Sequence, residues 1–297
     1  MTDVLKPINV KPLLRGYTGS KYDFLDDIIP HFPRKIGTFV DMFAGGGSIS
    51  ANVKNAAKII MNEFQPPILK FHETEHNHTA GQIVKHLNSR IESFNLHFDN
   101  PDGYYEMREL YNTEGNPLDL ILLARMSFSG IISFTPDWKF SNTWASGNGK
   151  GKALPINTEF INDIVVYKKA TGNQIREFVN GSFENFPIDI LKPGDFVYCD
   201  PPYFATKAKY NKFWGDEQLQ HLADMFQYFI DNGIGFGYSD MMIVNDVCNV
   251  IMYDFVKRNK GKVIMKRINS DYTNSLDKKK RVDSGKNLEI YMTNIIK

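Results

Sequence analysis

The stretch that decides the fold is "GTFVDMFAGGGSISANV", residues 37–53. Its apolar first part ends at three consecutive glycines, residues 45–47, which is typical of a buried strand followed by a tight loop and the start of a helix. A second apolar run, "AKIIMNEF" at 57–64, follows and ends near Glu63. This order predicts a βαβ unit, the building block of α/β folds.

Two further strands are predicted toward the C-terminus, "GDFVYCD" at 194–200 and "IGFGYSD" at 234–240. Between them, "DEQLQHLADMFQYFIDNG" at 216–233 has the apolar spacing of an amphipathic helix, with Asp216 as its N-cap. "NLEIYMTNII" at 287–296 is predicted to complete the sheet. Strands that alternate with helices predict a parallel, doubly wound, Rossmann-like α/β sheet.

Residues 73–165 break this alternation with polar, aromatic and glycine-rich stretches such as "PDGYYEMRELYN" at 101–112. We therefore expect a mostly helical domain at 73–165, inserted into a main domain formed by residues 1–72 and 166–297.

The glycine loop indicates a ligand. In a βαβ unit such a loop lets a ligand approach the backbone, and an acid at the end of the next strand, here Glu63, can bind ribose hydroxyl groups. "AGGGSIS" at 44–50 has neither the lysine of a P-loop nor the G-x-G-x-x-G spacing, so a nucleoside without pyrophosphate is favoured. S-adenosylmethionine is such a ligand, and its amino-acid end would lie near the helix N-terminus. The alternative is a purely structural turn.

The strand at 194–200 ends in "CDPPYF", where Asp200 is followed by Pro201, Pro202 and Tyr203. Taken alone, Asp-Pro and Pro-Pro predict only a strand that stops at a rigid turn. Because proline fixes φ, such a turn also holds the neighbouring carboxylate and carbonyl in one geometry, as an active site requires.

Composition excludes several classes of protein. A chain of 297 residues with 42% apolar residues can bury a large core, and its longest aliphatic run, "LDLILLARM" at 118–126, is too short to span a bilayer. We expect a cytoplasmic protein with no membrane role, because the first residues lack the apolar stretch of a secretory signal. The net charge is only +1, but residues 257–281 contain ten Lys or Arg, which indicates either a basic face or a solvated surface.

Four blocks together resemble the Dam-type adenine-specific DNA methyltransferases (D12 class, alpha group), with the closest likeness to phage-encoded members. They are "YTGSKYDFLDDIIPHFP" (17–33), "FVDMFAGGGSIS" (39–50), "MNEFQPPI" (61–68) and "DPPY" (200–203), in the order of that family. The resemblance spans nearly the whole chain. It implies a catalytic methyltransferase domain at 1–72 and 166–297 and a target-recognition domain, which binds double-stranded DNA, at 73–165.

The resemblance implies a role for each matching residue. The expected contacts to S-adenosylmethionine are Tyr17, Lys21, Phe43, Ala44, Gly45, Gly46, Gly47, Glu63 and Asp200. The expected catalytic residues are Asp200, Pro201, Pro202 and Tyr203. The Asp200 carboxylate and the Pro201 carbonyl would accept the two hydrogens of an exocyclic amine, so that its nitrogen lone pair points at the methyl donor. Tyr203 would stack on an adenine flipped out of the duplex.

Two alternatives stay open. The same geometry serves methylation of the cytosine 4-amino group, although relatives of that kind more often have serine where Asp200 stands. The other alternative is a DNA-binding protein that keeps the fold without the reaction, and the joint presence of Lys21, Glu63 and Asp200 argues against it.

"ARMSFSGIISFTPDWKFSNTWASG" at 124–147 resembles the base-reading β-hairpin of the family, but Ser133 stands where GATC-recognising relatives have a guanine-reading arginine. A serine hydroxyl cannot form the bidentate pair of a guanidinium with guanine, so we expect a specificity altered from GATC. The expected DNA contacts are Arg125, Phe128, Ser129, Gly130, Ser133, Lys139, Lys207 and Lys209. Arg125, Lys139 and Asn142 are candidate substitutes for the arginine, and each also fits a phosphate contact or an ordinary surface position.

No metal is expected. His72, His76 and His78 have a spacing that could hold one, but polar histidines at this point are more typical of a solvated helix end, and methyl transfer from a sulfonium needs no metal. The sequence leaves open whether the protein is a monomer or a weak dimer and whether it has a restriction endonuclease as partner. The resemblance implies a bacterial cell or a phage-infected host.

Overall fold

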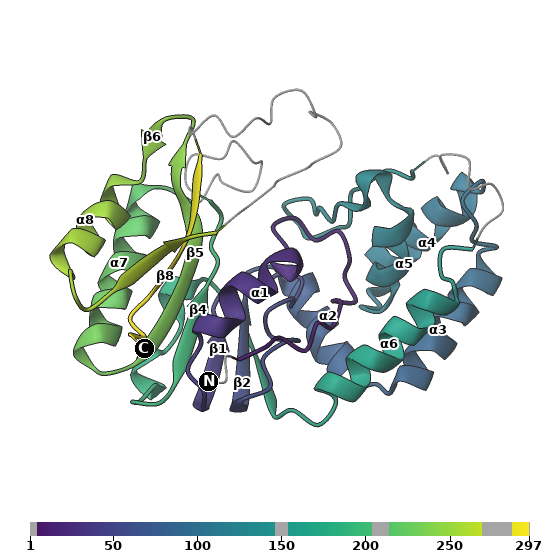
Figure 1. The fold of residues 1–297 in the computed structure, drawn as a ribbon. Coiled ribbons are helices and arrows are strands. Elements are labelled where there is room, and N and C mark those ends of the chain that lie inside the picture. Colours follow the sequence, from purple (N-terminus) through teal and green to yellow (C-terminus); the bar gives the residue numbers. More distant parts are fainter. Residues whose placement is uncertain (1–4, 146–153, 204–213, 269–286, 297) are drawn as a thin grey trace.

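The computed structural model describes residues 5–145, 154–203, 214–268 and 287–296. Within these residues the centre of the molecule is an eight-stranded sheet (Figure 1). Its strands are β1 (Ile36–Asp41), β2 (Ala56–Glu63), β3 (Arg176–Asn180), β4 (Phe196–Cys199), β5 (Gly235–Val244), β6 (Val247–Cys248), β7 (Ile264–Arg267) and β8 (Leu288–Thr293).

The strand order is β3-β2-β1-β4-β5-β8-β7, and β6 pairs with β5 in a hairpin. The strands β1 to β5 are parallel, in the 3-2-1-4-5 order of a doubly wound Rossmann-like sheet, which confirms the predicted fold class. The prediction of a wholly parallel sheet is wrong on the C-terminal side, because β8 runs antiparallel between β5 and β7. The sheet is therefore mixed.

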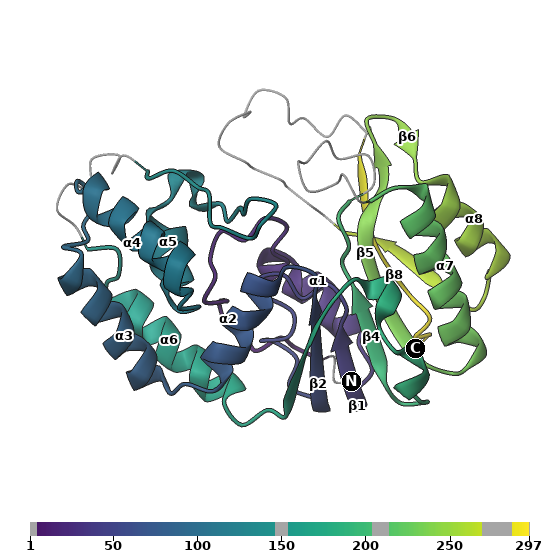
Figure 2. The same cartoon turned by 180° about the vertical axis from the view of Figure 1, so that it is seen from behind.

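The described residues also form α-helices and short 3-10 turns. The α-helices are α1 (Leu25–Ile28), α2 (Pro66–His76), α3 (Ala80–Ser93), α4 (Pro101–Glu114), α5 (Asp119–Met126), α6 (Thr158–Thr171), α7 (Asp216–Asp231) and α8 (Val250–Arg258). Short 3-10 turns are η1 (Tyr22–Phe24), η2 (Ile29–His31), η3 (Phe128–Gly130), η4 (Phe183–Asn185) and η5 (Ile188–Ile190). Figures 1 and 2 place α3 to α6 together on one side of the molecule, and α7 and α8 on the other side.

The alternation of side chains along β4 explains the two covered faces of the sheet. Phe196 and Tyr198 point into a core shared with α1 and η2, whereas Val197 and Cys199 point into a core shared with α7 and α8. Both faces are buried, so the strand is apolar throughout its length.

Residues 42–53 form turns instead of the predicted helix start. Gly45 and Gly47 have positive φ values of 48° and 75°, which bend the chain back on itself. The Asn52 side chain then pairs with Val10, accepting from its N–H at 2.8 Å and donating to its carbonyl at 2.9 Å. These two hydrogen bonds satisfy the backbone polar groups of Val10 and fasten the turns to the N-terminal segment.

The helical part of the chain does not have a core of its own. Its buried cluster combines residues of α3 to α6 with Leu13 and Leu14 of the N-terminal segment and with Phe71 of α2. The predicted boundary between 165 and 166 falls inside α6, which packs on α3 and continues to Thr171. The division into two domains therefore stays a prediction, and the packing runs across it.

The predicted β-hairpin is reduced to isolated bridges, one between Ser127 and Trp144 and one between Phe134 and Phe140. Its turn is closed where the Thr135 N–H donates to the Lys139 carbonyl at 2.8 Å. In α7, Gly215 rather than Asp216 is the N-cap, and its N–H donates to the Gln218 side chain at 3.1 Å.

Candidate active site at the strand ends

Asp200 follows the last residue of β4 and lies at the carboxyl edge of the parallel strands. Lys21, from the N-terminal block, approaches the Asp200 carboxylate with an Nζ to Oδ1 distance of 2.9 Å. The Lys21 side chain is 2% exposed and that of Asp200 is 14% exposed, so solvent screens this ion pair weakly. The structure thus joins two residues that the sequence separates widely.

Burial raises the pKa of Asp200 from its ordinary 3.8 to about 6. The Lys21 charge opposes this rise in the Asp200 pKa, and the negative charge of Glu289 adds to it. At neutral pH Asp200 is therefore mostly an ionised carboxylate, which can accept hydrogen bonds.

Tyr203 completes the "DPPY" turn. Lys21 Nζ lies over the Tyr203 ring, 4.7 Å from its centroid, and the Tyr203 hydroxyl donates to Glu289 Oε1 at 2.6 Å. Pro201 is buried and Pro202 is half-buried. The predicted catalytic residues thus lie around one point at the end of β4.

Glu63, the last residue of β2, holds the glycine loop. Its Oε2 accepts from the Gly45 N–H at 2.7 Å and its Oε1 accepts from the Gln65 N–H at 2.9 Å. Burial raises the pKa of Glu63, while these backbone hydrogen bonds lower it. A buried acid fixed by backbone donors at a strand end fits a ribose-binding group.

Two side chains pack so closely on the loop that only glycine fits there. A Cβ on Gly45 would lie 2.7 Å from Tyr17 Cε1, and a Cβ on Gly46 would lie 2.9 Å from Tyr17 Cβ. A Cβ on Gly47 would lie 2.8 Å from His72 Cε1. The predicted cofactor residues Tyr17, Gly45, Gly46 and Gly47 are therefore brought into contact.

The other two predicted cofactor residues of the loop, Phe43 and Ala44, make different contacts. Ala44 is buried, and its N–H donates to the Asn62 carbonyl at 2.9 Å. The Phe43 ring packs against Phe183 and Trp214, with centroid distances of 5.3 and 5.7 Å. Phe43 thus forms an aromatic wall on one side of the loop.

Sequence reasoning missed three acids or bases of this site. His72 donates through Nε2 to the Gly45 carbonyl at 2.7 Å, and burial lowers the pKa of His72 to about 4, so the ring is neutral. Asp41, at the end of β1, accepts from the Ser50 hydroxyl at 2.5 Å, and burial raises the pKa of Asp41 to about 7. The position of Asp41 at a strand end was a usable signal. Glu289 had no comparable signal.

The three histidines considered as metal ligands make different contacts. His72 supports the glycine loop, His76 packs beside Phe178, and His78 Nδ1 bonds the Thr74 carbonyl at 2.7 Å. Among the described residues, no three His, Cys, Asp or Glu side chains form a group that could hold a metal ion.

The hairpin region, residues 127–144, touches the site at two points. A Cβ on Gly16 would lie 2.2 Å from the Gly130 carbonyl oxygen, so the N-terminal block packs directly on this region. At the tip, the Trp138 ring contacts Phe64, the residue after Glu63, with a centroid distance of 5.9 Å. The hairpin region therefore packs against Gly16 and against the residue that follows β2.

The expected DNA contacts differ in exposure. Phe128 is 63% exposed and the Lys139 side chain is 60% exposed, whereas Ser133 is bonded through its hydroxyl to Asn142 Oδ1 at 2.6 Å. Arg125 is turned inward, donating to the Pro155 carbonyl at 2.6 Å and lying 4.0 Å from the centroid of the Phe160 ring. This placement favours a structural role for Arg125, because its guanidinium already has partners within the protein.

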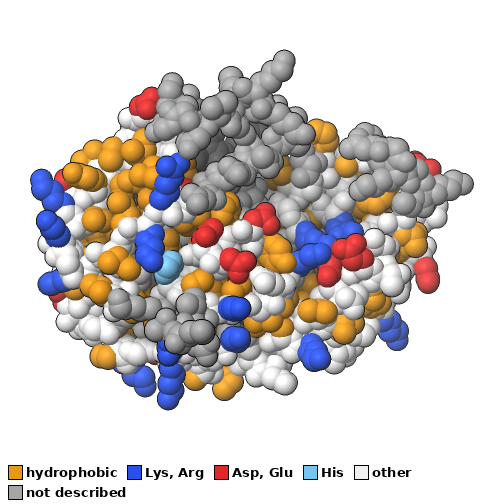
Figure 3. All heavy atoms as spheres, in the orientation of Figure 1, with side chains coloured by type: hydrophobic (Ala, Val, Ile, Leu, Met, Phe, Trp, Pro, Cys, Tyr) orange, Lys and Arg blue, Asp and Glu red, His pale blue; other side chains and the backbone are white. Residues whose placement is uncertain are grey.

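Two expected DNA contacts, Lys207 and Lys209, lie outside the described residues, as does the part of the basic stretch from 269 onward. On the face shown in Figure 3, the visible Lys and Arg side chains are scattered among acidic ones. Among the described residues no helix has the length and apolar character needed to cross a membrane.

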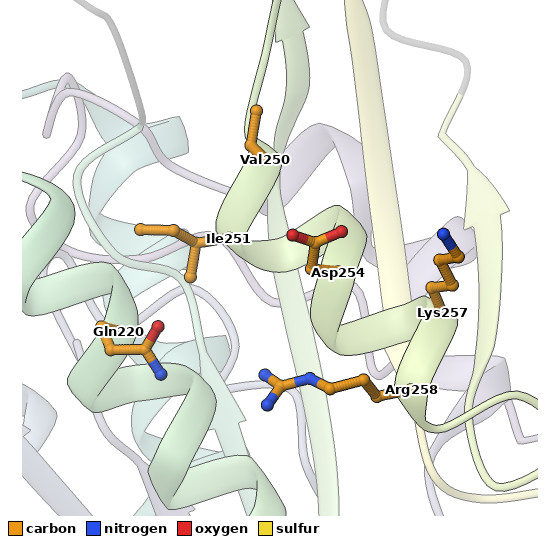
Figure 4. A pocket seen from close by; sticks show the side chains of 6 residues that line it. All are labelled: Gln220, Val250, Ile251, Asp254, Lys257 and Arg258. Carbon is orange, nitrogen blue, oxygen red and sulfur yellow. The ribbon is translucent and has the colours of Figure 1, made fainter.

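A surface hollow lies between α7 and α8 (Figure 4). It is lined by Gln220, Val250, Ile251, Asp254, Lys257 and Arg258. It contains none of the residues described at the strand ends, so it is separate from the site around Asp200.

The chain matches the family described as D12 class N6 adenine-specific DNA methyltransferase over residues 17–280. It belongs to this family. The family resemblance predicted from the sequence is confirmed, while the closer likeness to phage-encoded members stays a prediction.

Several proteins are similar to this D12 methyltransferase family member. Type II methyltransferase M.FokI of Planomicrobium okeanokoites is 30% identical over 285 residues, which cover 94% of this chain and 42% of that protein. Modification methylase StsI of Streptococcus sanguinis is 28% identical, covering 81% of this chain and 37% of its own length. The chain thus spans about two fifths of the length of these relatives.

A shorter relative is the DNA adenine methylase of Haemophilus influenzae, which is 22% identical, with 74% of this chain and 76% of that protein covered. Among solved structures, the rRNA methyltransferase aviRa from Streptomyces viridochromogenes covers 96% of this chain and 90% of its own, with 10% identity and a TM-score of 0.36. That score is too low to bear on the fold, which the strand order describes instead.

Proposed function

We propose that the protein transfers a methyl group from S-adenosylmethionine to the 6-amino group of an adenine flipped out of double-stranded DNA. The observation that carries this proposal is the meeting of Lys21, Asp200 and Tyr203 at the end of β4, next to the glycine loop. Membership of the D12 family supports adenine as the base.

The residues present fit the cofactor. Glu63 presents a buried carboxylate, fixed by backbone donors, beside the glycine loop, and Tyr17 and His72 pack on that loop. Glu63 would hold the ribose hydroxyl groups, while Tyr17 and Phe43 would border the loop. S-adenosylmethionine supplies an electrophilic methyl group when bound.

The chain itself prepares the amine. An exocyclic amine is a poor nucleophile because its lone pair is delocalised into the ring. The Asp200 carboxylate and the Pro201 carbonyl would accept its two hydrogens, which draws the nitrogen toward tetrahedral geometry and stabilises the developing positive charge. Lys21 pairs with Oδ1 of Asp200, and the second carboxylate oxygen would accept from the amine.

DNA selection would fall to the hairpin region. The exposed Phe128 ring and the Lys139 ammonium fit a base step and a phosphate respectively. Ser133 is already bonded to Asn142 and lacks the reach of an arginine, which supports a specificity altered from GATC. The protein would act as a monomer or weak dimer.

One experiment tests the proposal. The protein is incubated with methyl-labelled S-adenosylmethionine and duplex DNA of random sequence, the DNA is hydrolysed, and the modified base and its sequence context are identified. We expect label in N6-methyladenine. Label in N4-methylcytosine would replace the proposal with cytosine methylation, and tight DNA binding without label would identify a binding protein. Methylation confined to GATC would contradict the altered specificity.

A further inference from the structure

Glu289 is a buried acid in the interior of the sheet. It is the second residue of β8, it is 2% exposed, and it lies opposite Met241 of β5. A carboxylate at such a position is unfavourable unless hydrogen bonds satisfy it. Its presence in a mostly apolar strand therefore requires a hydrogen-bond partner at a defined position.

That partner is the aromatic residue of the "DPPY" turn. The Tyr203 hydroxyl donates to Glu289 Oε1 at 2.6 Å, although the two residues are 86 positions apart in the chain. This length lies in the range of about 2.5 to 2.7 Å found for charge-assisted O–H···O⁻ bonds, which are roughly twice as strong as neutral ones. The far end of the Tyr203 ring is thus anchored to the sheet.

A second contact fixes the face of the same ring. Lys21 Nζ lies 4.7 Å from the ring centroid and 2.9 Å from Asp200 Oδ1. Glu289 and Lys21 therefore hold Tyr203 at two points, its hydroxyl edge and one face of its ring. The chain of contacts Glu289–Tyr203–Lys21–Asp200 joins β8 to the carboxylate that follows β4.

We propose that Glu289 is a positioning residue of the methyl-transfer site, which acts through the Tyr203 hydroxyl to hold the ring where the flipped base stacks. The inference rests on the proposed function. Donation of the hydroxyl proton to a carboxylate also makes the ring richer in electrons, so that the ring stabilises the positive charge that develops on the amine. Glu289 thereby acts on the chemical step and not on binding of S-adenosylmethionine.

The test is a double-mutant cycle of Tyr203→Phe and Glu289→Leu, measured as the single-turnover rate of adenine methylation. Because a small misplacement of reacting groups lowers rates strongly, we expect each single variant to lose about tenfold in rate. The double variant should lose no more than either single variant, since both remove the same contact. Affinity for S-adenosylmethionine should stay unchanged.

A conservative variant and a matched control separate positioning from stability. Glu289→Gln keeps an acceptor for the hydroxyl and should retain most of the rate, and it should have no further effect when combined with Tyr203→Phe. If Glu289→Leu fails to fold, Tyr203→Phe alone tests the contact, and a wild-type rate for that variant would overturn the inference. Tyr167→Phe removes a similar bond, from the Tyr167 hydroxyl to Glu75 Oε1 at 2.8 Å in the helical part, and should lower the melting temperature without changing the rate.

Two further results would overturn the inference. Losses that multiply in the double variant, or a Glu289→Leu variant with the wild-type rate, would show that Glu289 does not act through Tyr203. These results leave adenine methylation by the wild-type protein intact, so only the inference fails. A wild-type protein that leaves adenine unmethylated overturns the proposed function, and the inference with it.

Discussion

The strand ends and the hairpin region, residues 127–144, are built in opposite ways. At the strand ends Lys21, Glu63 and Asp200 are largely buried and each is held by a partner from another part of the chain. In the hairpin region, Ser133 and Lys139 are exposed and bond only to their neighbours in the same region. The proposed catalytic groups are thus fixed by burial, whereas the proposed DNA contacts can change without repacking the core.

The largest effect is expected at the strand ends, where the side chains are buried. Asp200→Ala should lower the methyl-transfer rate by at least about 10²- to 10³-fold, because it removes an electrostatic group aimed at the reacting amine. The rate is measured in single-turnover assays with labelled S-adenosylmethionine. Binding of S-adenosylmethionine is measured separately by calorimetry, because Asp200 is also an expected contact of the cofactor, and the rate is compared at saturating S-adenosylmethionine.

Asp200→Ala also leaves the Lys21 charge buried without its counterion, which is destabilising by about 3 kcal/mol or more. The double variant Asp200→Ala with Lys21→Met removes that charge and serves as the folding control. A near wild-type rate in the stably folded single variant would disprove the role of the carboxylate.

Gly47→Ala tests whether the glycine loop is as rigid as its packing indicates. The new Cβ would meet the His72 ring at 2.8 Å in a backbone with φ of 75°, so we expect a loss of about 1 to 3 kcal/mol in stability. Binding of S-adenosylmethionine should weaken by about tenfold or more. Gly81→Ala is the control, since a Cβ there meets nothing within 4 Å. Equal effects of the two substitutions would contradict the packing argument.

The pH dependence tests the Lys21–Asp200 pair. The reaction needs the ionised Asp200, whose pKa is about 6, so the rate should fall about tenfold per pH unit below pH 6. Lys21→Met removes the positive charge that lowers the pKa of Asp200, and the falling limb should move to higher pH. Rates are measured from pH 5 to 9. If the rate of Lys21→Met falls at the same pH as that of the wild type, Lys21 does not lower the pKa of Asp200.

The protonation of Asp200 should affect stability in the opposite direction, because low pH lowers the rate but favours the folded state. The pKa of Asp200 is about 6 in the folded protein and 3.8 in its ordinary state, so the folded state binds the proton more tightly. The contribution of Asp200 to stability is therefore fully present below about pH 4 and is lost as the pH rises through 6. Urea unfolding of wild-type and Asp200→Asn proteins across this range measures it.

The smallest effect is expected in the hairpin region. Lys139→Ala removes an exposed charge that, as a phosphate contact, should change affinity for DNA only a few fold and lower the slope of log K against log salt by about 1. Base preference should not change. A loss of preference at one position of the target would instead make Lys139 a base-reading residue.

The sequence predicted the strands β1 and β2, the glycine loop and the positions of Glu63 and Asp200 at strand ends, because each is signalled locally. Apolar runs mark strands, and an acid or glycine at the end of a parallel strand lies at the edge where ligands bind. The sequence failed where long-range ties decide the backbone, as at residues 42–53, where Asn52 pairs with Val10 and turns replace the predicted helix.

By itself, then, the sequence determined the fold class, the family and the edge of the sheet where the site lies. Only the tertiary structure brought Lys21 to Asp200, Tyr17 and His72 onto the glycines, and Glu289 to Tyr203. The reason is physical. Periodicity and turn chemistry act over a few residues, whereas a buried charge is held by whichever partner the packing of distant segments brings within hydrogen-bonding reach.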